Sequence, residues 1–427
     1  MKHRVIRHQL AGGTEGLVID VPGSSVVSLQ VRFNSGFQFG DPELYEVPHV
    51  LEHVLSTVTK KHPKPNEFFV EAQKNGAYVN AFTGVDTNGY VYECADFELD
   101  RILTLVDEQI SEPLFERASV LAEIGNVREE LTRNLTQHST ICAVSLSEKC
   151  YPHLWKGYEA RIKQLPGILP RHLQDYHGRT HTARNARFYV AGHFPDGGER
   201  TAERLEKAFA KLPEGERFVR SREIGRGLTK SVVVKRDIEQ LYYRIAMFFG
   251  ELTEPQRRAA TLLRMVLVGG MGSRVIGEAR KRGLAYAVGG VGHAEPGNSS
   301  FGFTGYVTTD NADALFELVG REYAAVRDGG VTERELDAAK DLMIGTVKRS
   351  TQTVGDLLGW YVDPYDETGE IRDFDETMEQ LQGVSVGQVT DVARQASGGG
   401  RRGLSFLGPV TPIAAARYAS HVEKLWS

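Results

Sequence analysis

Residues 48–57, PHVLEHVLST, place two histidines and one glutamate within five positions. Pro48 fits the first turn of a helix, where its missing N–H costs nothing, so we expect a helix here. On that helix His49 and His53 lie one turn apart on one face, and Glu52 lies at the edge of that face. Two imidazoles placed in this way can bind one metal ion, but a catalytic zinc site usually needs a third protein ligand. The stretch therefore indicates either a metal site or an ordinary helix that carries two histidines.

The segments on both sides of this helix predict strands followed by blocks of helix. β-Branched and aromatic residues bounded by glycine or proline are typical of strands. They occur in residues 16–21, 25–36, 77–84 and 88–95, and helical patterns fill much of residues 97–134. Because helices follow strands as blocks rather than alternating with them, the sequence predicts an α+β fold.

The second half of the chain repeats this order of elements. Residues 213–230 are charged, contain glycine and lack periodicity, as is typical of a linker. We therefore predict an N-terminal domain over residues 1–212, which carries the histidine motif, and a C-terminal domain over residues 231–427, which lacks it. An internal duplication would make each domain an antiparallel-rich β-sheet with helices packed on one face.

The composition argues against several kinds of partner. The net charge of -5 at pH 7 comes from interleaved acidic and basic residues, which leaves no basic stripe for nucleic acid. No stretch approaches the ~20 apolar residues of a membrane span, and the first residues lack the apolar segment of a secretory signal. The three cysteines form no CxxC pair and no disulfide framework. We expect a cytoplasmic protein with neither nucleic acid nor membrane as a partner.

A third metal ligand would come from a second helix, and residues 121–134, LAEIGNVREELTRN, supply glutamates for it. Glu123 and Glu130 are seven residues apart and share one helix face, whereas Glu129 points about 100° away from Glu130. Two aligned glutamates that face a histidine pair are typical of a ligand and its support. The alternative is that Glu123 is a surface residue of a charged helix.

With these residues the chain resembles the pitrilysin and mitochondrial-processing-peptidase family of zinc metallopeptidases. That family has an HxxEH motif, followed after a characteristic interval by a glutamate that completes the zinc site. In this sequence the same interval after His53 ends at Glu130. A second family glutamate, seven residues earlier, corresponds to Glu123. Residues 80–93, NAFTGVDTNGYVYE, and 272–288, GSRVIGEARKRGLAYAV, are also similar to family segments, so the resemblance covers essentially the whole chain.

The resemblance implies one Zn²⁺ per chain, with His49, His53 and Glu130 as ligands. It implies that Glu52 is the general base, which takes a proton from zinc-bound water as that water attacks a peptide carbonyl. Glu123 would then orient a ligand or the water.

The resemblance also implies substrate contacts. Asn80 and Ala81 correspond to an edge strand to which an extended peptide adds its backbone, although YVNAF is equally consistent with an ordinary strand. Family members carry an arginine and a tyrosine, seven residues apart, that reach the active site from the C-terminal half. Tyr286 matches the tyrosine, but the position seven before it is Ala279, and Arg280 is only six before it. On a helix this shift turns the side chain by about 100°, so we expect a partner chain to supply the arginine. The alternative is that Arg280 itself takes this role.

Together these features predict a zinc-dependent endopeptidase that cleaves unfolded peptides or leader- and presequence-like segments inside a dimeric chamber. Because the family's chamber needs about four such domains, a two-domain chain is expected to dimerise. The displaced arginine favours a heterodimer in which this chain is the zinc-bearing subunit. The alternatives are a self-sufficient homodimeric peptidase and a non-catalytic structural subunit.

Overall fold

The computed structural model describes residues 1–295 and 297–426, and it confirms the α+β fold, with two sheets and helices packed on them. The chain forms two compact units. The first unit comprises residues 1–133, 158–221 and 350–371, and the second comprises residues 134–157, 222–349 and 372–427. Each unit is built from three separate segments of the chain. The domain boundaries at residues 212 and 231 divide the sequence into two halves, and they stay a prediction.

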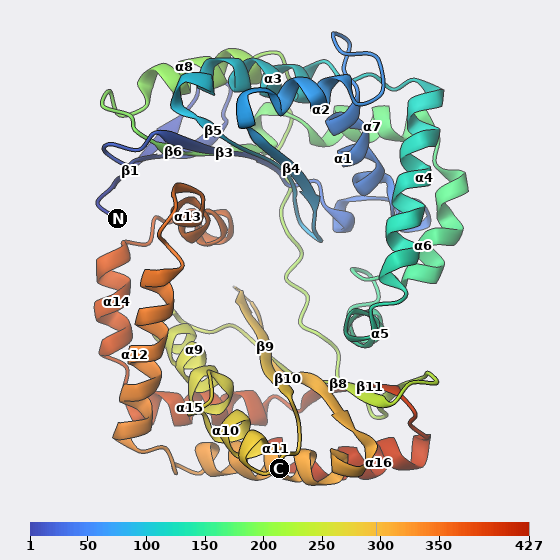
Figure 1. Cartoon of the computed structure of the whole chain (residues 1–427), viewed down its shortest axis with the longest axis vertical. Coiled ribbons are helices and arrows are strands. Elements are labelled where there is room, and N and C mark those ends of the chain that lie inside the picture. The colour runs from blue at the N-terminus through green and yellow to red at the C-terminus, as the bar shows by residue number, and fades with distance from the viewer. Residues whose placement is uncertain (296, 427) are drawn as a thin grey trace. The chain divides into compact units, whose positions relative to one another are not determined.

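The first unit contains a six-stranded sheet in the order β1-β2-β6-β3-β5-β4 (Figure 1). Its strands are β1 (Arg4–Gln9), β2 (Glu15–Asp20), β3 (Val26–Phe33), β4 (Tyr78–Thr83), β5 (Asn88–Ala95) and β6 (Ala186–Gly192). All neighbours pair antiparallel except β2 and β6, which are parallel. Strand β4 lies at one edge of this sheet, next to β5.

One face of this sheet packs against most of the first unit's helices. These are α1 (Val47–Thr57), α2 (Glu67–Ala72), α3 (Leu99–Ser111), α4 (Arg117–Asn134), α6 (Tyr158–Gln164), α7 (Pro170–Thr180) and α8 (Glu199–Phe209). Alternate strand residues such as Val18 and Phe188 face the core under these helices, as the two-residue period of a strand requires. This core also buries the apolar face of α1 and thereby fixes the helix that carries the histidines.

The other face of the same sheet is covered by α13 (Val354–Thr368), a helix from the second half of the sequence (Figure 1). The intervening strand residues Leu17, Ile19 and Tyr189 pack there against apolar residues of α13. Strand β6 is therefore buried along its whole length. The sequence predicted helices on one face of the sheet, and α13 adds a layer on the second face.

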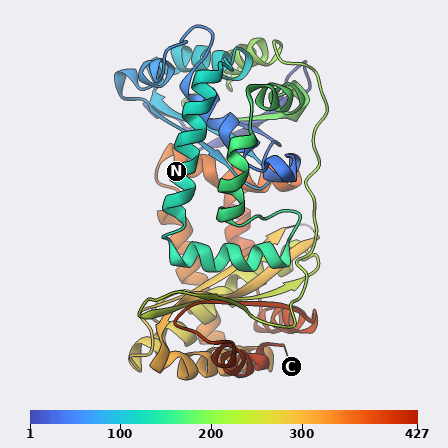
Figure 2. The same ribbon diagram turned by 90° about the vertical axis from the view of Figure 1, so that its right-hand side faces the viewer.

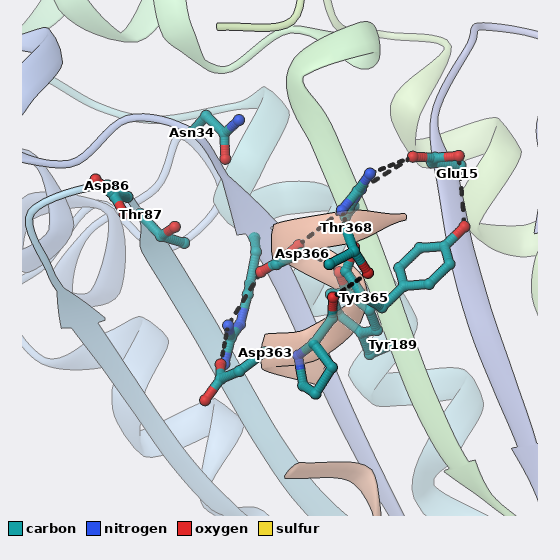
Figure 3. Close-up of polar contacts among 12 residues, drawn as sticks. Glu15, Asn34, Asp86, Thr87, Tyr189, Asp363, Tyr365, Asp366 and Thr368 are labelled. Carbon is teal, nitrogen blue, oxygen red and sulfur yellow. Dashed lines mark hydrogen bonds and ion pairs between the residues drawn. The ribbon is translucent and has the colours of Figure 1, made fainter. Parts of the chain in front are cut away.

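Polar side chains fasten α13 to the strands beneath it (Figure 3). The buried carboxylate of Asp366 accepts hydrogen bonds from Arg32 at 3.0 Å, from Arg187 at 3.4 Å and from the Tyr189 hydroxyl. Arg187 also donates to Glu15 of β2, at 2.5 Å. Burial opposes the ionisation of Asp366, but the neighbouring arginines outweigh it and hold the pKa of this carboxyl below its ordinary value.

The second unit repeats the strand order of the first. Its sheet runs β7-β11-β8-β10-β9, and only β7 and β11 pair parallel. The strands are β7 (Val232–Lys235), β8 (Gln240–Phe249), β9 (Ala287–Glu295), β10 (Asn298–Thr308) and β11 (Arg401–Gly408). This order corresponds one to one with β2-β6-β3-β5-β4, including the parallel pair, as an internal duplication predicts.

The second half of the sequence gives the second unit the helices α9 (Glu254–Val268), α10 (Arg274–Lys281), α11 (Thr309–Arg327), α12 (Glu333–Arg349), α14 (Phe374–Gln382), α15 (Val386–Gly398) and α16 (Pro412–His421). The main core of this unit contains Ile245 and Met247 of β8. The alternate residues Ala246 and Phe248 face the opposite side, where α5 (His138–Cys150) covers the sheet (Figure 2). The sheet of the first unit is thus covered on one face by α13, from the second half of the sequence. The sheet of the second unit is covered in the same way by α5, from the first half.

Candidate metal centre

The residues of α1 fix both the start of the helix and the face that carries the histidine motif. The helix begins at Val47, with Pro48 in its first turn as predicted. Val50, Leu51, Val54 and Leu55 are completely buried in the core, which fixes the rotation of the helix about its axis. His49 and Glu52 are buried as well, whereas His53 is partly exposed.

Helix α4 brings Glu130 to both histidines. The Glu130 Oε2 atom lies 3.5 Å from His49 Nε2 and 3.7 Å from His53 Nε2. Two ligand atoms of a tetrahedral zinc ion are about 3.4 Å apart when each metal bond is 2.0–2.1 Å long. Both distances from the Glu130 oxygen are close to that spacing, and two nitrogens with one carboxylate oxygen are donors that zinc accepts.

The second nitrogen of each imidazole is held by another carboxylate. His49 Nδ1 lies 2.9 Å from Glu46 Oε2, and His53 Nδ1 lies 3.2 Å from Glu123 Oε2. We call Nδ1 the outer nitrogen and Nε2, which faces Glu130, the inner nitrogen of each histidine. A carboxylate on the outer nitrogen fixes the orientation of a metal-binding histidine and makes its inner nitrogen a stronger electron-pair donor to the metal. The structure thus places Glu123 beside His53, where it can orient a ligand.

Sequence reasoning missed Glu46. This carboxylate is fully buried and also accepts a hydrogen bond from Arg161 of α6. The Arg161 guanidinium lies over the rings of Phe37, Tyr45 and Tyr158, with its carbon 4.8, 5.4 and 4.9 Å from the ring centroids. Burial opposes ionisation of Glu46, but hydrogen bonds from His49 and Arg161 hold its pKa below the ordinary value. The available signal was the position of Glu46 three residues before His49, which places it one turn away.

Glu52 sits beside the histidines without bonding to either outer nitrogen. One of its oxygens lies within 4.8 Å of the histidine ligand atoms, and its Oε2 accepts a hydrogen bond from Thr83 of β4 at 3.1 Å. Burial raises the pKa of Glu52, although His49 and His53 act in the opposite direction. A carboxylate whose pKa is raised is a better proton acceptor near neutral pH.

Without a metal, the surrounding carboxylates favour charged imidazoles. Burial works against protonation, yet hydrogen bonds to glutamates raise the pKa of His49 to about 9 and that of His53 to about 10. Hydrogen bonds from the two histidines likewise lower the pKa of Glu130. The cluster is therefore a set of negative groups that stabilises positive charge.

The other histidine pair at the same spacing behaves differently. Burial lowers the pKa of His177 to about 4 and lowers the pKa of His181 as well. His177 contacts the carbonyl of Ile110, and His181 contacts the hydroxyl of Tyr90. These contacts and the lowered pKa values are those of buried histidines with a structural role.

Asn80 and Ala81 lie on β4, the edge strand that also carries Thr83. Asn80 is exposed and Ala81 is half-buried, and both pair with β5, opposite Val91 and Tyr90. Among the described residues, no strand pairs with the other side of β4. The backbone there can accept an additional strand.

Tyr286 and Arg280 belong to the second unit, so the cluster described above consists of first-unit residues alone. Helix α10 ends at Lys281, and Gly283 turns the chain with a positive φ of 64°. The Arg280 guanidinium then lies over the exposed ring of Tyr286, 4.5 Å from its centroid. Ala279 is buried.

The helices of residues 1–295 and 297–426 include none with the length and apolar character that crossing a membrane requires.

Two family models match the chain. The model described as "Insulinase (Peptidase family M16)" covers residues 17–157, and "Peptidase M16 inactive domain" covers residues 169–343. The chain therefore belongs to peptidase family M16, the pitrilysin or insulinase family of zinc proteases.

Curated relatives carry matching names. The uncharacterized zinc protease YmxG of Bacillus subtilis is 23% identical over 398 residues, which are 91% of this chain and 95% of that protein. The uncharacterized zinc protease ML0855 of Mycobacterium leprae is also 23% identical, over 95% of this chain and 92% of its own length. Human insulin-degrading enzyme is 27% identical over 127 residues, which are 30% of this chain and 12% of that enzyme.

Solved structures share the fold. A peptidase M16 inactive domain from Pseudomonas fluorescens superimposes with a TM-score of 0.83 at 17% identity, over 96% of this chain and 98% of that one. A protease from Helicobacter pylori gives a TM-score of 0.82 at 18% identity, over 96% and 99% of the two chains.

Proposed function

We propose that this protein is a zinc-dependent endopeptidase. The observation that carries the proposal is the convergence of Glu130 Oε2 on the Nε2 atoms of both His49 and His53, at 3.5 and 3.7 Å. The names of the full-length relatives, which are called zinc proteases, support the same activity.

In this proposal His49, His53 and Glu130 bind one zinc ion per chain. Glu130 is preferred to Glu52 as the third ligand because its oxygen has the tetrahedral spacing to both histidines, whereas Glu52 is engaged by Thr83. Glu46 and Glu123 keep the outer nitrogens of the two histidines occupied. The inner nitrogens are then left for the metal.

A zinc ion bound there would lower the pKa of its water towards ~7 and polarise the substrate carbonyl. Glu52 would take a proton from the attacking water and give it to the leaving amine as the peptide bond breaks. Its buried position and its hydrogen bond from Thr83 hold one oxygen in place while the other stays available. Glu52 is therefore the general base in this mechanism.

The open edge of β4 is proposed to bind the substrate as an added strand, with Asn80 and Ala81 in contact with it. Backbone pairing recognises extended peptide more than particular side chains. The proposed substrates are therefore unfolded peptides and flexible leader- or presequence-like segments.

We further propose that the chain works as the zinc-bearing subunit of a heterodimer that encloses the substrate. This rests on the sequence, since Ala279 stands where the family has its arginine, and the arginine that stacks on Tyr286 is Arg280. A homodimer remains the alternative. All three cysteines are free and buried, which supports a reducing location such as the cytoplasm.

The proposal is tested with a quenched, unstructured peptide and with the zinc content of the purified chain, for the wild type and Glu52→Gln. The assays include any partner that has been found. We expect both proteins to bind zinc and only the wild type to cleave the peptide. Cleavage that persists in Glu52→Gln would contradict the assigned base. Zinc binding without cleavage under all conditions would favour the structural-subunit alternative.

The heterodimer is tested by native mass spectrometry and by the activity of the isolated chain. We expect zinc binding with poor cleavage until a related chain is added. Full activity of the lone chain, with Arg280→Gln reducing it, would instead show that this chain supplies its own arginine.

A further inference from the structure

A second polar site lies in the second unit, on the side of its sheet that α5 covers. A cavity of about 130 Å³ is lined there by the end of α5 and by strands β8, β9 and β10. The lining is formed by Leu146, Ser147, Tyr151, Trp155, Arg244, Ala246, Phe248, Val291, His293, Ser300 and Phe301. This volume holds several water molecules or one small ligand.

Arg244 is the only charged side chain of that lining. It alternates with Ala246 and Phe248 along β8, and it therefore points to the α5 side of the sheet. It is partly buried, and burial lowers the pKa of its guanidinium. Among the described residues, no carboxylate forms an ion pair with it. A half-buried guanidinium without a carboxylate partner attracts an anion, which would offset its partial loss of hydration.

A thiol near Arg244 does not supply the missing charge. Cys142 of α5 lies near Arg244, but burial raises the pKa of its thiol to about 11, even though Ser405 and Arg244 act in the opposite direction. The thiol is therefore neutral at pH 7 and leaves Arg244 uncompensated.

His293 adds a hydrogen-bond donor to the same cavity. The backbone N–H of His293 donates to the Ser300 hydroxyl oxygen at 3.3 Å, and the same oxygen lies 3.0 Å from His293 Nδ1. In the tautomer that we use for the proposal, the Ser300 hydroxyl donates to Nδ1. The ring proton then resides on Nε2. That Nε2 atom is buried, and the structure gives it no hydrogen-bond partner.

The remaining walls combine apolar side chains with Ser147, Tyr151 and Trp155. Leu146, Val291 and Phe248 contribute aliphatic and aromatic surface to the lining. A planar guanidinium and one imidazole N–H suit the two oxygens of a carboxylate, whereas phosphate and sulfate would need donors on more sides. Apolar walls suit a short hydrocarbon group attached to that carboxylate.

We propose that this cavity binds a carboxylate carried on a small apolar group, with Arg244 and His293 holding its oxygens. Two sources offer this chemistry: a free short-chain acid and the C-terminal carboxylate of a peptide that ends in a small apolar residue. The site shares no residue with the metal centre, so it stands or fails independently of the proposed peptidase activity.

The direct test is calorimetric titration of the full chain with propionate, with propionamide as the neutral control. We expect saturable binding in the millimolar range for propionate and none for propionamide. Arg244→Gln should weaken propionate binding about tenfold or more, whereas Arg394→Gln, which alters an exposed arginine of α15, should not change it. His293→Ala should weaken binding by a smaller factor.

The stability of the variant gives a second readout. Because Arg244 is uncompensated without ligand, Arg244→Gln should unfold no more easily than the wild type, and propionate should raise the melting temperature of the wild type only. The proposal is overturned by the absence of saturable propionate binding up to about 50 mM. It is equally overturned by phosphate binding as tightly as propionate, or by Arg244→Gln binding propionate as the wild type does.

The two sources are separated by titrating the Glu52→Gln chain with trialanine and with trialanine amide. A peptide C-terminus is identified as a ligand if the Glu52→Gln chain binds trialanine but not trialanine amide. The same chain with Arg244→Gln added should then no longer bind trialanine. Binding of propionate without trialanine identifies the free acid. Either outcome supports a carboxylate site.

Discussion

The Glu46 carboxylate contacts His49 Nδ1 at 2.9 Å and also accepts a hydrogen bond from Arg161. Arg161 in turn is packed among three aromatic rings, so Glu46 has little freedom to move. A fixed carboxylate on the outer nitrogen fixes the direction in which His49 Nε2 points. The geometry of the metal centre therefore depends on residues beyond the HxxEH motif.

Glu46→Gln should weaken zinc binding by about 10–100-fold, because the amide keeps the size of the side chain but loses the charge that makes His49 a stronger donor. Competition with a chromophoric chelator measures the dissociation constant. Glu129→Gln is the matched control, since Glu129 is an exposed glutamate of α4 next to Glu130. Equal zinc affinity in Glu46→Gln and the control would show that Glu46 has no role in positioning His49.

Zinc binding should release protons. In the metal-free chain the pKa of His49 is about 9 and that of His53 is about 10, so both imidazoles are charged at pH 7 and must become neutral to bind metal. We expect about two protons released per zinc at pH 7, falling towards zero above about pH 10, with affinity rising as the pH rises. Calorimetry in buffers of different ionisation enthalpy measures this number. A binding enthalpy that is the same in all buffers would contradict it.

Thr83→Val should slow peptide cleavage about tenfold without changing zinc content. The substitution removes the 3.1 Å hydrogen bond to Glu52 Oε2, so the general base loses its orientation while the metal ligands are untouched. We expect the change in kcat rather than in KM, and Thr83→Ser, which keeps the hydroxyl, should retain most activity. Loss of zinc in Thr83→Val would mean that Thr83 supports the metal site instead.

Asp366→Asn should destabilise the first unit by about 3–5 kcal/mol, because it leaves buried arginines without their shared carboxylate. The Asp366 side chain is 3% exposed, whereas that of Asp363, which also pairs with Arg32, is 72% exposed. Asp363→Asn is therefore the control and should cost at most about 1 kcal/mol.

The fluorescence of Trp360 on α13 reports this unfolding in a Trp155→Phe, Trp426→Phe background, since the chain has three tryptophans. Similar urea midpoints for Asp366→Asn and Asp363→Asn would show that the buried carboxylate does not anchor α13.

Helical periodicity in the sequence predicted which of the candidate side chains share one face of a helix. His49, Glu52 and His53 follow from their spacing on one helix, and Glu123 and Glu130 from theirs on another. Glu46 lies next to the same motif, but its role depends on Arg161, which is 115 residues away in sequence. No local pattern specifies such a contact.

The α+β fold and the repeated strand order also followed from the sequence, but the exchange of α5 and α13 did not. An apolar helix face indicates that a helix is covered, without indicating which sheet covers it. Strand β6, ARFYVAG, carried a partial signal, because a strand without polar alternation is buried on both faces.

The central claim is that His49, His53 and Glu130 hold one zinc ion while Glu52 stays free as the base. Equilibrium dialysis at a fixed free zinc concentration, followed by metal analysis, tests it with the wild type, Glu52→Gln and Glu130→Gln. We expect one zinc per chain in the wild type and in Glu52→Gln, and little zinc in Glu130→Gln. Zinc retained by Glu130→Gln but lost from Glu52→Gln, or a wild type without zinc, would contradict this assignment.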